Sequence, residues 1–130
     1  MMDRYIYSIM PVSSDADYSE KRVCLDRVAA EFGLSVHFPL DRGLPAAGKE
    51  FDLRAVVTTI GEATAVIADL SLERPSCYYE LGLAQALGCR VSLIARAGTI
   101  IHQAFGRNAV SYFQDLQDYP AVVRSMLANT

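Results

Sequence analysis

Two carboxylates, Glu80 and Asp69, each interrupt or end an apolar segment of the chain. Glu80 lies in SCYYELGLAQALG, residues 76–88, where apolar residues follow it at helical spacings of three, four and seven. Pro75 marks the first turn of this helix, so Glu80 lies close to the helix N-terminus. A glutamate there either favours the positive end of the helix dipole or points into a ligand crevice.

Asp69 ends the β-prone run TAVIAD, residues 64–69, and is expected at the carboxyl end of a central strand. As a lone residue it would cap the following loop by accepting from backbone N–H groups, that of Ser71 in particular. If it faces the same crevice as Glu80, the two carboxylates suit the chemistry of a glycosidic bond. One attacks or stabilises the positively charged anomeric carbon, and the other handles the leaving group's proton or orients the sugar.

The elements that would position these carboxylates alternate between strand and helix along residues 1–130. The expected strands are residues 5–10, 34–38, 63–68, 90–95 and 108–112. The expected helices are residues 18–32, 51–60, 76–88 and 120–127, with a further helical piece after Gly98-Thr99. This alternation predicts a single α/β domain, a three-layer sandwich with a parallel sheet of about five strands. Its ligand site is expected beyond the carboxyl ends of the strands, in loops 10–17, 38–49, 69–79 and 95–102.

Composition excludes several classes of protein. With 52% hydrophobic residues, 21% charged residues and a net charge of -3, the chain reads as globular, without the broad basic surface that nucleic acid or anionic lipid requires. The three cysteines lack CxxC spacing and histidine partners, which predicts reduced core residues and no metal site. No stretch approaches the roughly 18 apolar residues of a membrane span. We therefore expect a cytoplasmic protein without a cofactor.

The segment ATAVIADLSLERPSCYYELGLAQALGCRVSLIA, residues 63–95, resembles the signature of the nucleoside 2-deoxyribosyltransferase-like superfamily, which includes nucleotide N-glycosidases and TIR-like domains. In that pattern a strand ending in aspartate is followed by a polar loop, a helix with an aromatic-Glu-Leu-Gly core, and another apolar strand. Two weaker matches are YIYSIMPVS, residues 5–13, and AFGRNAVSYFQDL, residues 104–116.

The resemblance implies a flavodoxin-like fold in which Glu80 is the nucleophile or oxocarbenium stabiliser that cleaves a ribosyl–base bond. Asp69 corresponds to the strand-end acid of the motif, with a role in holding sugar or base. The expected substrate-binding residues are Tyr7, Met10, Ser13, Tyr79 and Arg107. The first loop lacks the Gly-rich phosphate cradle of the nucleotide-hydrolysing members, and the AFG before Arg107 replaces an acidic residue of many relatives. Base, sugar, phosphorylation state and the choice between hydrolysis and transfer therefore stay open.

Two other functions fit the same residues. One is a TIR-like immune effector that splits the nicotinamide–ribose bond of NAD, and the other is a module that binds a nucleotide without cleaving it. Arg42, Lys49, Arg96 and Arg107 could hold a phosphate if they converge, whereas singly each is a solvated surface charge.

Assembly is the last expectation from the sequence. Members of the superfamily commonly pair so that one subunit's loop closes the other's site. The helix of residues 51–60 and the nearly all-apolar helix after Pro75 must be buried somewhere, which predicts a homodimer or homotetramer. The alternative is a monomer in which the sheet and the final helix cover both helices.

Overall fold

The computed structural model describes residues 4–11, 14–38, 52–72, 74–101 and 105–129, with Arg107 described by its backbone alone. The strands are β1 (Tyr5–Ile9), β2 (Ser35–His37), β3 (Ala65–Asp69), β4 (Val91–Arg96) and β5 (Ser111–Phe113). The helices are α1 (Tyr18–Glu31), α2 (Leu53–Gly61), α3 (Pro75–Ala86) and α4 (Tyr119–Ala128), with a 3-10 helix, η2 (Arg107–Ala109), before β5. All strand pairs are parallel, in the order β2-β1-β3-β4-β5. The predicted fold class, an α/β sandwich with a five-stranded parallel sheet in a flavodoxin-like arrangement, is confirmed.

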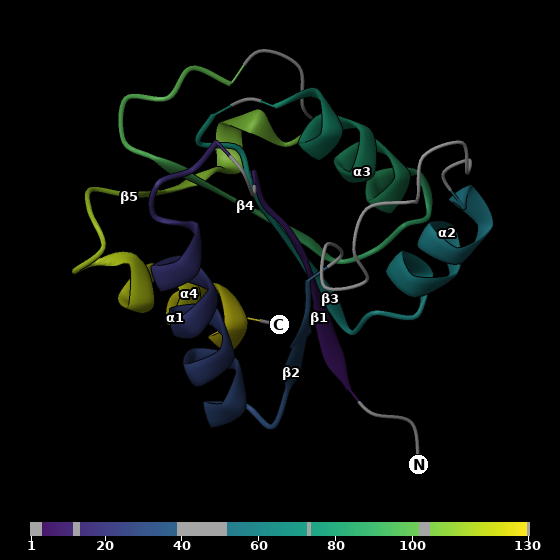
Figure 1. The fold of residues 1–130 in the computed structure, drawn as a ribbon, viewed down its shortest axis with the longest axis horizontal. Coiled ribbons are helices and arrows are strands. Elements are labelled where there is room, and N and C mark those ends of the chain that lie inside the picture. The colour runs from purple at the N-terminus through teal and green to yellow at the C-terminus, as the bar shows by residue number, and fades with distance from the viewer. Residues whose placement is uncertain (1–3, 12–13, 39–51, 73, 102–104, 130) are drawn as a thin grey trace.

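The sheet lies between two pairs of helices, α1 with α4 on one face and α2 with α3 on the other (Figure 1). Successive side chains of each strand point to opposite faces. In β3, Ile67 joins the core under α1 and α4, whereas Val66 and Ala68 join the core under α2 and α3. Every residue of β3 is buried, as expected for a central strand covered on both sides.

The last third of the chain differs from the prediction. Residues 99–101 are not helical, and of the segment expected as a strand at 108–112 only Ser111 and Tyr112 belong to β5, which ends at Phe113. Gly106, with φ of 84°, begins a tight turn in which the N–H of Ala109 donates to the carbonyl of Gly106 at 2.8 Å. This turn forms η2 and delays the start of β5. The helix expected from residue 51 begins at Leu53, because Asp52 caps it by accepting from the N–H of Ala55.

The chain changes direction across the sheet between β1 and β3. β1 leads to α1 on one face, and β3, its neighbour in the sheet, leads to α3 on the opposite face. The connections after these two strands therefore lead to opposite faces of the sheet, and the carboxyl ends of β1 and β3 form the switch point that is the usual ligand position in an open parallel sheet.

No helix among the described residues is long and apolar enough to cross a membrane. In the same part of the chain, no group of three or more His, Cys, Asp or Glu residues could hold a metal ion. The three cysteines are free thiols, and Cys24 and Cys77 are buried in the core.

Candidate active site

Glu80 lies in the second turn of α3 and is held by a tyrosine from the sheet. Tyr7, in the middle of β1, points its ring toward α3 and donates a hydrogen bond from its hydroxyl to Oε1 of Glu80 at 3.3 Å. Tyr7 is only 1% exposed, so its position is fixed by packing. Burial raises the pKa of Glu80 from 4.5 to about 6, although the hydrogen bond from Tyr7 opposes this shift. The structure thus brings together two residues that the sequence placed on separate elements.

His37 supports Tyr7 from the neighbouring strand. The two residues are in register in the β1–β2 pair, and their rings stack with centroids 5.3 Å apart and an interplanar angle of 24°. No sequence signal pairs His37 with Tyr7, because the pairing depends on the register of two strands that are far apart in the chain.

Asp69 points to the α1 side of β3, whereas Glu80 lies on the α3 side of the sheet, and the convergence of the two carboxylates on one ligand stays a prediction. Its side chain lies on the same face of β3 as Ile67 and forms a 2.8 Å ion pair with Nζ of Lys21, from α1. Its other carboxylate oxygen accepts from the N–H of Ser71 at 2.9 Å, which is the capping role weighed as the alternative. Asp69 is 1% exposed. Its observed contacts are structural, on the α1 side of the sheet, whereas Glu80 lies on the α3 side.

The other expected substrate-binding residues do not all lie on the Glu80 side of the sheet. Met10 is buried in the core under α1 and α4, on the opposite face from Glu80, because it alternates with Ile9 at the end of β1. Tyr79 is 53% exposed on α3, beside Glu80 in the sequence. Ser13 and the side chain of Arg107 lie outside the described residues.

Lys21 is the residue that sequence reasoning missed. Its side chain is 1% exposed, and its ammonium group pairs with Asp15 at 2.6 Å as well as with Asp69 and lies 4.9 Å from the centre of the Phe113 ring. Buried lysines occur almost only where their charge is paired. The sequence did contain a signal, since Lys21 precedes Leu25 by four residues and Val28 by seven, and so falls on the apolar face of α1.

A second ion pair extends this network along the carboxyl edge of the sheet. Nη2 of Arg96, at the end of β4, lies 2.6 Å from Oδ2 of Asp17, and the backbone N–H of Arg96 donates to Oγ of Ser71 at 3.0 Å. We call the residues Asp15, Asp17, Lys21, Asp69, Ser71 and Arg96 the edge network. It ties the loop after β1 to the ends of β3 and β4.

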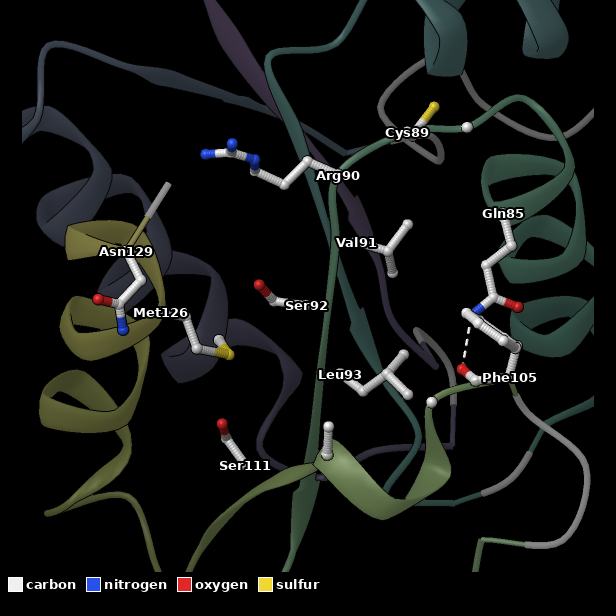
Figure 2. Close-up of a pocket in the computed structure, with 13 residues that line it drawn as sticks. Gln85, Cys89, Arg90, Val91, Ser92, Leu93, Phe105, Ser111, Met126 and Asn129 are labelled. Carbon is white, nitrogen blue, oxygen red and sulfur yellow. Dashed lines mark hydrogen bonds between the residues drawn. The ribbon is translucent and has the colours of Figure 1, made fainter.

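The groove drawn in Figure 2 is separate from Glu80. It has a volume of about 710 Å³ and follows the amino-terminal half of β4, between the C-terminal end of α3 and α4. Gln85 borders it, and its side-chain amide donates to the carbonyl of Phe105 at 2.7 Å. Neither Tyr7, Asp69 nor Glu80 lines this groove.

Three solved structures share the fold. A 2-deoxyribosyltransferase from Bacillus psychrosaccharolyticus matches with a TM-score of 0.61 and 23% identity, over 89% of this chain and 90% of that one. The CMP N-glycosidase BcmB of Clostridium botulinum matches with a TM-score of 0.60 and 16% identity, over 91% and 96%. A 2-desoxiribosyltransferase from Leishmania mexicana matches with a TM-score of 0.51 and 26% identity, over 71% and 64%. No protein-family model and no curated protein matches the sequence. The expected resemblance to deoxyribosyltransferases and nucleotide N-glycosidases is confirmed in the fold.

Replacing Lys21 by methionine should lower the free energy of unfolding by about 3–5 kcal/mol, because two buried carboxylates lose their shared cation. Urea unfolding followed by circular dichroism measures the effect. Adding Asp69→Asn to Lys21→Met should recover part of the loss. Arg124→Met breaks the exposed ion pair with Glu31 and serves as the control, with little change expected. A Lys21→Met variant as stable as the wild type would contradict the structural role of this lysine.

Replacing Glu80 by glutamine should stabilise the fold at neutral pH. Since the folded state raises the pKa of Glu80 from 4.5 to about 6, ionisation is penalised on folding, and stability falls as pH rises through this window. Glu80→Gln should therefore be more stable than the wild type by about 1–2 kcal/mol at pH 7.5, with the difference vanishing near pH 4. Urea unfolding at both pH values checks this.

The matched control is Glu31→Gln. The hydrogen bond from Arg124 lowers the pKa of Glu31, so its removal should bring no gain in stability at pH 7.5. A Glu80→Gln variant less stable than the wild type at pH 7.5 would show that the carboxylate is a structural partner in the core.

Proposed function

We propose that this chain cleaves the N-glycosidic bond of a nucleoside or nucleotide, by hydrolysis or by transfer of the sugar to another base. The observation that carries the proposal is Glu80 itself, a half-buried carboxylate on the helix that follows β3, with its pKa raised to about 6 and a buried tyrosine bonded to it. The fold shared with a deoxyribosyltransferase and a CMP N-glycosidase supports the same chemistry.

In the proposed reaction, the ionised carboxylate of Glu80 acts on the anomeric carbon, C1′. It attacks C1′ or stabilises its positive charge while the C1′–N bond breaks and the base leaves with the electron pair and takes up a proton. Water or a second base then takes the sugar. A negative charge in a partly desolvated position stabilises the developing cation more than it would in water. The hydrogen bond from the Tyr7 hydroxyl holds the Glu80 carboxylate in the orientation for this reaction at C1′.

Release of free base from a panel of nucleosides, nucleotides and NAD tests the proposal, with products separated by liquid chromatography. Glu80→Gln should lower the rate by about a hundredfold or more, because the amide keeps the shape and loses the charge. A rate within a few-fold of the wild type would reject Glu80 as the key residue. Release of nicotinamide alone would favour the NAD-cleaving alternative, and binding without any base release would favour the binding module.

The pH dependence gives an independent check. Because the carboxylate is the active form, kcat/KM for base release should rise with pH through about 6 and level off above it. Initial rates between pH 4.5 and 8 measure this profile. A rate that falls with rising pH over this range would instead require a protonated Glu80.

We also propose that the chain forms a homodimer or homotetramer through α2 and α3. Several apolar side chains on these helices are exposed, namely Leu53, Tyr79 and Leu87 at 44%, 53% and 46%. Exposed apolar surface of this kind is typical of a surface that another subunit covers.

Light scattering during size exclusion should give twice or four times the 14.3 kDa mass of one chain. Leu53→Glu should reduce that mass toward the monomer, because it places a charge in the interface. Val23→Glu changes a 63% exposed residue of α1, on the opposite face, and should leave the mass unchanged. A wild-type mass near that of one chain would contradict the assembly.

A further inference from the structure

His37 lies on β2, at the edge of the described sheet, beside the tyrosine that is bonded to Glu80. In the β1–β2 pair it lies opposite Tyr7 (Figure 1). Paired residues of neighbouring strands direct their side chains to the same face of a sheet, and successive residues alternate. Val36 packs against the core under α1 and α4, so His37, the next residue, is directed to the α3 side together with Tyr7.

The imidazole ring of His37 contacts both tyrosines of β1. It stacks on the Tyr7 ring, with centroids 5.3 Å apart and an interplanar angle of 24°, and it meets the Tyr5 ring at 6.2 Å and 57°. The Tyr5 hydroxyl donates to the carbonyl of Thr59 on α2 at 2.6 Å. The Tyr7 hydroxyl donates to Glu80 on α3 at 3.3 Å. His37 therefore packs beside the two side chains that join β1 to α2 and α3.

The Tyr7 ring lies between its two neighbours in the sheet. Val66 of β3 pairs with Tyr7 on one side, and His37 of β2 pairs with it on the other. Val66 is fully buried in the core under α2 and α3, whereas His37 is half-buried. Both side chains lie on the same face of the sheet as the ring, so together they limit the angle at which the ring stands over the sheet.

The hydrogen bond between Tyr7 and Glu80 is sensitive to the angle of this ring. Its length of 3.3 Å exceeds the roughly 2.5–3.0 Å typical of bonds between two oxygens. A small tilt of the ring away from α3 would therefore break it. The bond favours the ionised form of Glu80 and lowers its pKa against the effect of burial. The residue that fixes the Tyr7 ring thus also affects the charge of the proposed catalytic carboxylate.

Among the described residues, burial and Tyr7 set the pKa of Glu80. Cys77, one turn earlier on α3, has a pKa raised to about 12 and is a neutral thiol at pH 7. Arg22, the cation beside β2, lies 4.5 Å from the centre of the Phe38 ring, which is buried on the α1 side. A change in the pKa of Glu80 therefore reports on its hydrogen bond from the tyrosine.

We propose that His37 is a positioning residue of the site, whose ring stacks on Tyr7 and holds the tyrosine hydroxyl against the carboxylate of Glu80. The ring acts by packing, and it affects the reaction through Tyr7 without touching the sugar. An aromatic side chain is required at this position because stacking fixes the orientation of the neighbouring ring. This inference rests on the proposed function and adds a third residue to the proposed site.

The first test measures the ionisation of Glu80 without turnover. NMR titration of carbon-13-labelled glutamate carboxyl groups gives its pKa, and the Glu80 signal is the one absent from Glu80→Gln. Tyr7→Phe removes the hydrogen bond and should move the midpoint to higher pH by about half to one pH unit. His37→Ala should move it in the same direction. His37→Phe keeps a stacking ring and should leave the midpoint in place.

Three results of this titration overturn the inference. One is an unchanged midpoint in His37→Ala or in Tyr7→Phe. Another is an equal change in His37→Phe, which would assign the effect to the charge or the hydrogen bonding of the imidazole. If circular dichroism shows that His37→Ala does not fold, His37→Val replaces it, because valine suits a strand and has no ring. Unfolding of both variants would show a purely structural role, which is the third such result.

The second test follows base release. His37→Ala should lower kcat by about tenfold and leave KM within about twofold, because the substrate still binds while the carboxylate is misplaced. His37→Phe should restore kcat. A raised KM with an unchanged kcat would mean that His37 contacts the substrate, and would overturn the positioning role. Absence of base release from the wild type rejects the proposed function, whereas the NMR titration still tests the inference.

The matched control is Ser35→Ala, on the same strand and the same face as His37. Ser35 pairs with Tyr5, two residues before Tyr7, and is exposed. The variant changes β2 and leaves the stacked rings in place, so the Glu80 midpoint and kcat should equal those of the wild type. An equal effect in this variant would assign the result to a loosened edge strand and overturn the specific role of His37.

Discussion

The arrangement of the carboxyl edge of the sheet depends on the buried ion pairs of the Lys21 ammonium group. It joins Asp15, in the loop after β1, to Asp69, at the end of β3, and through Ser71 the connection reaches Arg96 on β4. Parallel strands leave their connecting loops independent of one another, so backbone pairing alone does not fix these loops. Burying charges is costly, and such a cluster persists where all its partners are in place. Here it links the loop after β1 to the ends of β3 and β4.

The alternation of side chains along β1 and β3 separates this network from Glu80. Tyr7 points to the α3 side and Asp69 to the α1 side, because successive strand residues face opposite layers. One face of the edge therefore holds ion pairs, and the other holds a carboxylate whose polar partner is a tyrosine. The same sheet therefore carries an ion-paired support on one face and a partly desolvated acid on the other.

The sequence predicted the order of elements and the place of Glu80, because strand and helix periodicities are local and a carboxylate on an apolar face is visible in one helix. The face taken by Asp69 could not be predicted. β3 is apolar on both sides, so its pattern contains no alternation that assigns inward and outward residues. Lys21 was predictable by the reasoning applied to Glu80, whereas its partner Asp69 lies 48 residues away in the sequence. The late start of β5 depended on the turn at Gly106, which interrupts a β-prone segment.

Keeping the cations on the α1 side has a consequence for the proposed chemistry. The pKa of Glu80 is set by burial and by Tyr7, and neither Lys21 nor Arg96 contributes to it. An arginine or lysine beside Glu80 would lower its pKa and would already neutralise the charge that a developing oxocarbenium ion needs. A carboxylate with a pKa of about 6 is still ionised at neutral pH, yet it is more basic than an exposed glutamate. The edge network thus stabilises the loops at the carboxyl edge and leaves Glu80 without a pKa contribution from Lys21 or Arg96, as the proposed action on a sugar requires.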